Sequence, residues 1–277
     1  MSLFNIAVCQ MKVTDSKKDN ISRATKMIGE AVRNNKANII VLPEMFNCPY
    51  DTRVMTEYAE EYNGETCETL SSVAKELDVY IVGGSIPEKC DGKIYNTSFI
   101  FDNKGRIIGR HRKVHLFDVD IENGIKFKES DVLSPGDELT IVETKYCKIG
   151  VGICYDMRFP EMMRAMALSG ADVIVVPAAF NMTTGPAHWD SLIKIRAVDN
   201  QVYFVAASPA RNLEANYVAY GYSSILNPWG QPIGQATEQE GIICSTIDLE
   251  YIRKIREELP LLKNQSKILY NQRGDEF

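Results

Sequence analysis

The sequence predicts a layered α/β fold in which mixed β-sheets are covered by helices. Short apolar runs, typical of buried strands, alternate with segments whose apolar residues recur every three or four positions, as on one face of a helix. Pairs of strand-like segments joined by turn sequences interrupt this alternation, so some strands must be antiparallel. Strands that alternate with helices assemble into sheets with helices on their faces.

The elements of the first half follow this alternation. We expect its strands at residues 4–9, 38–42, 79–86, 95–101 and 106–112. The expected helices cover residues 20–34, whose apolar side chains fall on one face, and residues 65–77. The last two strands flank the sequence Asp102-Asn103-Lys104-Gly105, which is typical of a hairpin turn.

The second half has the same layout without a repeat of residues. We expect its strands at residues 148–153, 172–176, 201–206, 217–226, 230–234 and 242–247. Helices are expected at residues 160–169, 188–200 and 249–258. The least regular segment, residues 116–136, is long enough to be a functional loop. No linker or low-complexity stretch divides the chain, so we expect a single domain over residues 1–277.

The composition is that of a soluble globular protein. Apolar residues make up 45% and charged residues 25% of the 277 positions, which argues against disorder and against a polytopic membrane protein. The net charge of −6 argues against a nucleic-acid-binding protein, which needs a basic surplus. No run reaches the roughly 18 apolar residues of a membrane span. We therefore expect neither a nucleic-acid nor a membrane partner.

The cysteines point to a reducing compartment. There are seven, scattered and without a CxxC pair, which indicates reduced thiols inside the cell. The N-terminal sequence MSLFNIAVCQM lacks the features of a secretory signal. We favour the cytoplasm; a mitochondrial location is the alternative, although no Arg- and Ser-rich leader supports it.

Cys154 is the candidate nucleophile. It lies in GICYDMRFPE, where a strand is followed by a helix that opens near Pro160. The amides at a helix N-terminus and a nearby cation would lower the pKa of such a thiol. A buried structural cysteine at the end of a strand is the alternative, and we favour that alternative for the other six cysteines.

Glu44 and Lys113 also follow predicted strands directly. A carboxylate in the position of Glu44 should have its pKa raised by desolvation, which suits a general base. A salt-bridged glutamate, and a solvated lysine beside Arg110 and Arg112, are the alternatives for the two residues taken singly. In layered α/β folds the carboxyl ends of the strands form the ligand crevice, so the joint pattern with Cys154 favours an active site.

Histidine and metal chemistry have less support. His111, His115 and His188 are the only histidines that could pair with the thiol, so a cysteine–histidine enzyme stays open as an alternative. No histidine pair four residues apart carries the adjacent glutamate of a catalytic zinc site. We expect no metal.

The three strand-end motifs resemble those of the nitrilase superfamily of carbon–nitrogen hydrolases. LPEMF, HRKVHLF and GICYDMRFPE match its glutamate, lysine and cysteine segments in order and spacing, and the resemblance runs from residue 6 to about residue 270. It implies a four-layer αββα sandwich that forms a homodimer or a higher homo-oligomer, with a C-terminal tail (about residues 259–277) at the subunit interface. It also implies that Cys154, Glu44 and Lys113 form a catalytic triad that needs no cofactor.

The resemblance further implies a second glutamate, Glu129 in KFKESDVLSPGD, that orients the lysine and the substrate. From its spacing alone Glu129 would be a surface residue. The superfamily mechanism implies that a backbone N–H next to the nucleophile, that of Tyr155, helps Lys113 to hold the oxyanion.

Further motifs resemble the ω-amidase branch of the superfamily. They are HRKVHLFDVD, FNMTTGPAHW, RAVDNQVYFVAASPAR and NPWGQ. This resemblance implies hydrolysis of the terminal amide of 2-oxo dicarboxylic acid monoamides, such as 2-oxoglutaramate or 2-oxosuccinamate, through a thioester. A deaminated-glutathione amidase and an N-carbamoyl amino-acid hydrolase are the alternatives of the same chemistry, with a nitrilase the least favoured. A non-catalytic protein-binding module is the alternative of another class.

The remaining candidates would bind the substrate. The resemblance places a carboxylate-binding arginine at Arg158, whose alternative is a surface ion pair with Asp156 or Glu161. A loop that follows a predicted strand could wall the pocket, or it could be a plain turn around Gly185-Pro186; its members are Phe180, Asn181, Thr183 and Thr184. His115 lines the site or makes a structural hydrogen bond, and Tyr50 reaches the substrate or packs elsewhere. His188 is expected to be structural.

Overall fold

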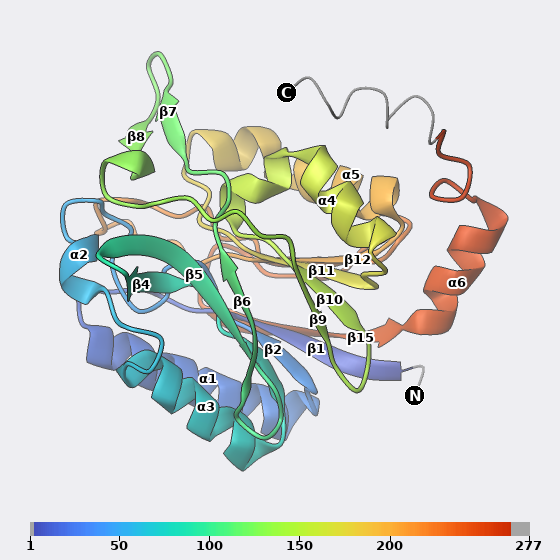
Figure 1. The fold of residues 1–277 in the computed structure, drawn as a ribbon, viewed down its shortest axis with the longest axis horizontal. Coiled ribbons are helices and arrows are strands. Elements are labelled where there is room, and N and C mark those ends of the chain that lie inside the picture. Colours follow the sequence, from blue (N-terminus) through green and yellow to red (C-terminus); the bar gives the residue numbers. More distant parts are fainter. Residues whose placement is uncertain (1–2, 267–277) are drawn as a thin grey trace.

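Two mixed β-sheets lie face to face in the middle of the computed structural model, which describes residues 3–266 (Figure 1). The strands of the first sheet follow the spatial order β15-β1-β2-β3-β5-β4, with β6 paired to β5. Their bounds are β1 Leu3–Gln10, β2 Ile39–Val41, β3 Tyr80–Val82, β4 Ile86–Cys90, β5 Lys93–Phe101, β6 Ile107–Arg112 and β15 Gly241–Asp248.

The second sheet has the order β14-β13-β12-β11-β10-β9. Its strands are β9 Thr140–Glu143, β10 Lys148–Val151, β11 Val173–Pro177, β12 Tyr203–Ala207, β13 Ser224–Leu226 and β14 Pro232–Gln235. Each sheet contains a parallel trio, β1-β2-β3 in the first and β10-β11-β12 in the second. This correspondence matches the layout that the two halves of the sequence share.

Helices cover the outer face of each sheet (Figure 1). The first sheet packs against α1 (Lys17–Asn35) and α3 (Glu65–Leu77). The second packs against α4 (Pro160–Leu168) and α5 (Thr184–Asn200). A short helix, α2 (Met55–Tyr58), and a last helix, α6 (Leu249–Glu258), complete the described fold. The predicted αββα sandwich is confirmed.

Alternation along the strands explains the four layers. In β1, Ile6 and Val8 point into the core between the sheets, whereas Ala7 and Cys9 face the helices. Side chains of a strand point alternately to its two faces, so a strand between another sheet and a helix layer must be apolar on both. That requirement accounts for the short, uninterrupted apolar runs in the sequence.

Most predicted elements are present, and the differences have local causes. The strand expected at residues 79–86 is two strands, β3 and β4, because the chain turns at Gly84 with φ +57°. Helix α5 begins at Thr184 and not at 188, so Gly185-Pro186 lies inside a helix and is not a turn. Only residues 224–226 of the expected strand 217–226 form a strand, and β9 and α2 were not predicted.

The irregular segment at residues 116–136 carries structure of its own. It contains a small hairpin, β7 (Asp118–Asp120) and β8 (Lys126–Lys128), followed by a 3₁₀ turn, η1 (Glu129–Asp131). The hairpin projects from the upper left of Figure 1. Part of the predicted C-terminal tail, residues 267–277, lies outside the described residues. Within residues 3–266, no helix is long and apolar enough to cross a membrane.

Gly84 offers a test of how tightly the turn after β3 is packed. A Cβ at Gly84 would lie 2.1 Å from the Pro43 carbonyl oxygen, whereas a Cβ at Gly92 would meet nothing within 4 Å, and both residues have positive φ. We expect Gly92→Ala to cost about 1–2 kcal/mol for the left-handed backbone alone, and Gly84→Ala a further 1–3 kcal/mol for the clash. Urea unfolding measures both, and equal costs would contradict the prediction.

Candidate active site

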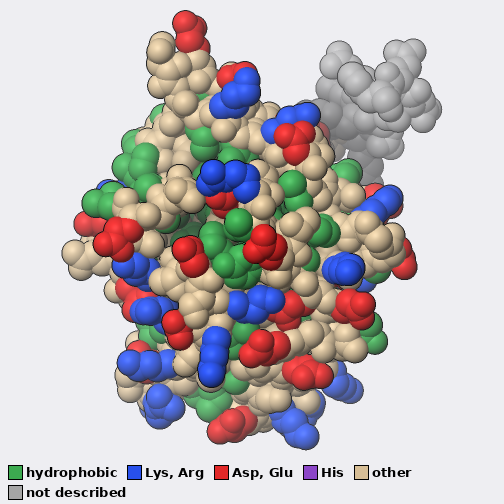
Figure 2. All heavy atoms as spheres, turned by 90° about the vertical axis from the view of Figure 1, so that its left-hand side faces the viewer, with side chains coloured by type: hydrophobic (Ala, Val, Ile, Leu, Met, Phe, Trp, Pro, Cys, Tyr) green, Lys and Arg blue, Asp and Glu red, His purple; other side chains and the backbone are tan. Residues whose placement is uncertain are grey.

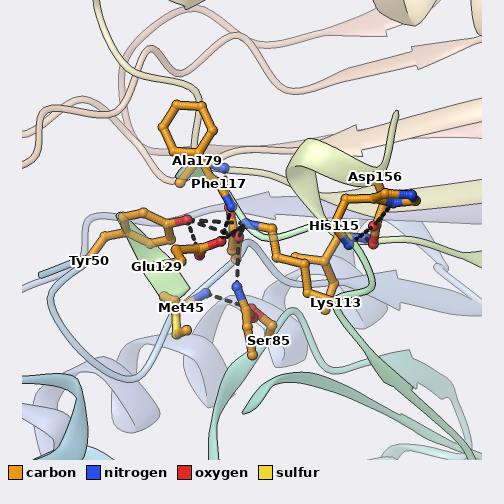
Figure 3. A network of polar contacts seen from close by, with 12 residues as sticks. Met45, Tyr50, Ser85, Lys113, His115, Phe117, Glu129, Asp156 and Ala179 are labelled. Carbon is orange, nitrogen blue, oxygen red and sulfur yellow. Dashed lines mark hydrogen bonds and ion pairs between the residues drawn. The ribbon is translucent and has the colours of Figure 1, made fainter. Parts of the chain in front are cut away.

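Glu44 is placed by a turn that begins just beyond β2. Pro43 ends the strand, and Met45 takes a left-handed conformation with φ +49°. The turn is held by Ser85, whose hydroxyl oxygen accepts the Met45 N–H at 3.0 Å and whose carbonyl accepts the Phe46 N–H at 3.2 Å (Figure 3). The Glu44 side chain is thereby fully buried.

The Glu44 carboxylate receives hydrogen bonds on both oxygens. Oε1 accepts from Lys113 Nζ at 3.0 Å and from Asn96 Nδ2 at 2.8 Å. Oε2 accepts the backbone N–H of Ala179, just beyond β11, at 2.7 Å. A group of the first sheet is therefore fixed by the backbone of the second.

Lys113 follows β6 and lies between two carboxylates. Its Nζ is 3.0 Å from Glu44 Oε1 and 2.9 Å from Glu129 Oε2, and 3.3 Å from the Tyr50 hydroxyl (Figure 3). The side chain is fully buried, and both of its carboxylate partners are too. The alternative of a solvated lysine in a basic run is wrong.

Glu129 is a buried residue, contrary to what its spacing alone predicted. One oxygen accepts the Tyr50 hydroxyl at 2.7 Å, and the other accepts the Phe117 N–H at 2.6 Å. Tyr50 therefore belongs to this buried network and not to the surface (Figure 3).

Cys154 sits at a strained position beyond β10. Its φ is +46°, which is uncommon for a residue with a side chain, and it opens the 3₁₀ turn η2 (Cys154–Arg158) ahead of α4. Helix α4 starts at Pro160, as predicted. Only 5% of Cys154 is exposed.

Asp156 holds this turn in place. Its carboxylate accepts the Ile153 N–H at 2.9 Å, and it contacts His111 Nε2 at 3.0 Å and His115 Nδ1 at 2.8 Å. Burial would raise the pKa of Asp156, but the two histidines and the backbone outweigh it, and the pKa lies below its usual range. The buried carboxylate therefore stays charged beneath the nucleophile turn.

The histidines do not support a cysteine–histidine pair. His111 and His115 both bind Asp156, and the His115 ring stacks on Phe159 with centroids 3.6 Å apart. Within residues 3–266 no histidine forms a hydrogen bond with Cys154. Of the two interpretations of His115, the structural hydrogen bond is the one present.

Electrostatics at the site reverse one expectation. Burial and the charge of Glu44 raise the pKa of Cys154 well above its usual value, and Lys113 only partly opposes them. The sequence-based expectation of a lowered thiol pKa is therefore wrong, first because the thiol is buried, and also because Glu44 and Glu129 oppose the effect of the Lys113 charge.

The pKa of Glu44 is raised, as expected, and that of Lys113 is raised as well. Burial raises the pKa of Glu44 in spite of the neighbouring Lys113 charge. Burial alone would lower the pKa of Lys113, but Glu129 and Glu44 outweigh it and raise that pKa well above the ordinary lysine value. The lysine stays charged, and the glutamate is a better base than a solvated carboxylate.

A small hollow opens over Cys154. It has a volume of about 190 Å³ including its open mouth, and its other lining residues are Phe117, Tyr155, Arg158, Ala179, Phe180, Thr184 and Tyr217. The structure thus brings four of the predicted substrate-binding residues to Cys154. Thr183 is not among them, since it is exposed and donates its backbone N–H to Asn181.

Arg158 presents an unpaired cation to this hollow. Its guanidinium carbon lies 4.8 Å from the Phe180 ring centroid, and Nη1 lies 3.2 Å from Nδ1 of His188. Burial lowers the pKa of Arg158. The alternative of an ion pair with Asp156 or Glu161 is wrong, because no carboxylate of residues 3–266 lies within 4 Å of it.

Sequence reasoning missed several groups of the site. The N–H of Ala179 and the amide of Asn96 bind Glu44, Tyr217 lines the hollow, and Asp156 holds the turn. Only Asp156 gave a local signal, two residues after Cys154. The part of the chain that the structure describes contains no cluster of three potential metal ligands among its His, Cys, Asp and Glu side chains.

A protein-family model for carbon–nitrogen hydrolases matches residues 5–257. The chain belongs to the carbon–nitrogen hydrolase family. It is a hydrolase that acts on carbon–nitrogen bonds, as the sequence motifs predicted.

Acidic and basic side chains are interspersed on the face shown in Figure 2, with hydrophobic side chains between them.

Relatives in this family are similar over nearly the full length. The chain is 49% identical over 271 residues to Omega-amidase NIT2 of Xenopus tropicalis, and 47% identical over 270 residues to Omega-amidase NIT2 of Homo sapiens; each alignment covers 98% of both chains. The crystal structure of Saccharomyces cerevisiae Nit3, a member of branch 10 of the nitrilase superfamily, is 42% identical with a TM-score of 0.87, covering 94% of this chain and 95% of that one.

The raised thiol pKa can be tested with Glu44→Gln. Removing the Glu44 charge removes a repulsion that raises the pKa of Cys154 and leaves more of the Lys113 charge to lower it. We therefore expect the pKa of the Cys154 thiol to fall in this variant. Thiolate ultraviolet absorbance against pH measures it, after subtraction of the same titration on a matched Cys154→Ala protein. An unchanged or higher pKa would contradict the electrostatic account.

Proposed function

We propose that this carbon–nitrogen hydrolase is an ω-amidase, which hydrolyses the terminal amide of 2-oxo dicarboxylic acid monoamides such as 2-oxoglutaramate to the 2-oxo acid and ammonia. The observation that carries the proposal is Arg158, an unpaired cation at the hollow over Cys154. A substrate with a carboxylate at its far end supplies the missing anion. The Omega-amidase NIT2 relatives support the same assignment.

The first half of the reaction forms a thioester. Glu44 takes the proton of the Cys154 thiol as the sulfur attacks the amide carbon. The raised pKa values of both groups suit this transfer, since the thiol holds its proton until a desolvated base accepts it. Glu44 then passes the proton to the amide nitrogen, and ammonia leaves.

Lys113 stabilises the oxyanion of each tetrahedral intermediate. Its Nζ stays charged between Glu44 and Glu129, and the backbone N–H of Tyr155 is the second donor. One such donor is worth roughly 3–4 kcal/mol of barrier. Glu129 and the Tyr50 hydroxyl hold the ammonium group of Lys113 in position, so both are positioning residues.

The lining of the hollow favours a short substrate with one anionic end. Aromatic side chains of Phe117, Tyr155, Phe180 and Tyr217 line it beside its one cation, Arg158. A 2-oxo monoamide matches this lining more closely than deaminated glutathione, a tripeptide analogue with further polar groups that would be left without partners.

A protein-binding module without activity is the weaker proposal. Burying Lys113 with two carboxylates costs several kcal/mol per ion before pairing, and apolar residues of similar size would serve a scaffold as well. A binding module needs neither this network nor a strained cysteine beside it.

We also propose a cytoplasmic homodimer of single-domain subunits. The family resemblance supports the dimer, and the reduced cysteines support the compartment. Large apolar side chains exposed on the α4–α5 side and in the described part of the tail suit a subunit contact; they are Leu168, Ile195, Leu259 and Leu261.

Ammonia release from a substrate panel tests the function. The panel is 2-oxoglutaramate, 2-oxosuccinamate, deaminated glutathione, an N-carbamoyl amino acid and a simple nitrile, with Cys154→Ala as the blank. Deaminated glutathione loses cysteinylglycine and not ammonia, so its hydrolysis is followed by release of that primary amine. We expect release mainly from the two 2-oxo monoamides and none from the folded variant. Release mainly from another member would move the substrate assignment, and turnover by Cys154→Ala would overturn the thioester mechanism.

Arg158 and His188 provide a test of carboxylate recognition. We expect Arg158→Met to raise KM for 2-oxoglutaramate about 10–100-fold, the worth of a charged hydrogen bond, with little change in kcat for a neutral amide of similar length. His188 is a positioning residue, because its Nδ1 holds the guanidinium at 3.2 Å.

His188→Leu should raise the same KM several-fold, and His188→Asn should restore it, because the Asn oxygen can take the place of Nδ1. Melting temperatures control for folding. An equal loss on charged and neutral amides would show that neither residue reads the carboxylate.

A further inference from the structure

A second, larger hollow reaches Glu44 from another side. It has a volume of about 1120 Å³ including its open mouth, and it lies between the start of the chain after β1, the turn after Glu44 and the loop that follows β12. Residues that line it are Lys12–Asp15 in the first segment, Glu44, Met45 and residues 48–51 in the second, and Pro209, Ala210, Asn212, residues 214–217 and Ala219 in the third. Cys154 does not line it.

The two hollows share a wall. Ala179 and Tyr217 line both. The Tyr217 hydroxyl donates to the Ala179 carbonyl at 2.6 Å, and the Tyr217 ring packs on Tyr50 with centroids 4.6 Å apart and on Phe127 at 5.5 Å. The Ala179 N–H holds Glu44 Oε2 at 2.7 Å. Glu44 therefore lies at the wall between the two hollows, with the Cys154 thiol on one side and the larger hollow on the other.

Hydrolysis of the thioester requires that water reach the acyl carbon from the side of Glu44. In the proposed acyl-enzyme, the acyl chain extends from Cys154 toward Arg158, along the small hollow that both residues line. The attacking water must occupy the position that the amide nitrogen has vacated, next to Glu44, because Glu44 gave its proton to that nitrogen and now takes one from water. The larger hollow is the described space that meets Glu44 without passing the acyl chain.

We propose that the larger hollow is the route by which water enters and ammonia leaves, separate from the pocket of the organic substrate. This inference rests on the proposed thioester mechanism. In the step it serves, Glu44 takes a proton from water, the hydroxyl bonds to the acyl carbon, the carbon–sulfur bond breaks, and the proton passes to the thiolate. The products are a carboxylic acid and the free thiol.

The lining of the larger hollow suits the passage of water and ammonia. Thr14, Asn212 and Asn216 offer hydrogen-bonding groups for water. Of its carboxylates, Asp51 is paired with Arg53 and Glu214 lies 3.8 Å from Lys12, the one lysine of the lining. The hollow therefore offers the anionic 2-oxo acid no unpaired cation, whereas Arg158 does so on the other side of the wall.

Filling the hollow tests the route. Ala215 lines it, whereas Leu213, two residues away, is 79% exposed and does not. We compare Ala215→Trp with Leu213→Trp as the matched control. We measure the steady-state fraction of Cys154 that carries the acyl group, by acid quench and intact-protein mass spectrometry. With added hydroxylamine, we also measure the ratio of hydroxamate to free acid.

We expect Ala215→Trp to slow deacylation several-fold, so that the acyl-enzyme accumulates, and to lower the hydroxamate-to-acid ratio, because hydroxylamine is larger than water. Leu213→Trp should do neither. Unchanged deacylation and an unchanged ratio in the Ala215 variant would overturn the route. Loss of acylation with a raised KM would also overturn it, since the hollow would then be the amide's own pocket.

Two controls keep the outcomes separate. If Ala215→Trp does not fold, judged by its melting temperature, Ala215→Leu gives the same comparison with a smaller side chain. If the wild-type protein turns over no amide at all, the proposed function fails, which is distinct from a failure of the route.

Discussion

The ammonium of Lys113, buried between the carboxylates of Glu44 and Glu129, is the constraint on which the rest of the site depends. Each of the three charges would be costly to bury alone, and together they are stable only if every remaining hydrogen-bonding position is filled. Asn96, Tyr50 and the N–H groups of Phe117 and Ala179 fill them. Segments far apart in the sequence are thereby held to one point, because moving any of them would leave a buried charge short of a partner.

The same constraint explains why the site lies between the sheets. Glu44 and Lys113 come from the first sheet, whereas Cys154 and the Ala179 N–H come from the second. The strand ends of both sheets supply short backbone turns with positive φ, at Met45 and Cys154, that point side chains inward. The strain at Cys154 is offset by Asp156, which is itself held by two histidines. Residues that look like candidate catalysts in the sequence thus serve the geometry of the nucleophile.

What could be predicted from the sequence was local. Glu44, Lys113 and Cys154 each follow a strand directly, so pattern and turn chemistry were enough to place them at a sheet edge. Glu129 could not be placed in this way, because its burial depends on Tyr50 and Phe117, which are distant or lie in an irregular segment. The lowered pKa expected for Cys154 was also wrong for a nonlocal reason, since the folded chain buries the thiol and brings Glu44 and Glu129 from other elements to oppose the Lys113 charge.

The charges differ between the two sides of the site. On the side of the thiol, Arg158 is positive, half-buried and without a carboxylate partner among residues 3–266. On the side of Glu44, the larger hollow is polar, and its one lysine, Lys12, lies 3.8 Å from Glu214. Under the proposed function, the amide therefore binds with its nitrogen toward Glu44 and its carboxylate toward Arg158. In this arrangement the proposed selectivity depends on the unpaired charge of Arg158, and the proposed reaction depends on the paired charges of Glu44, Lys113 and Glu129.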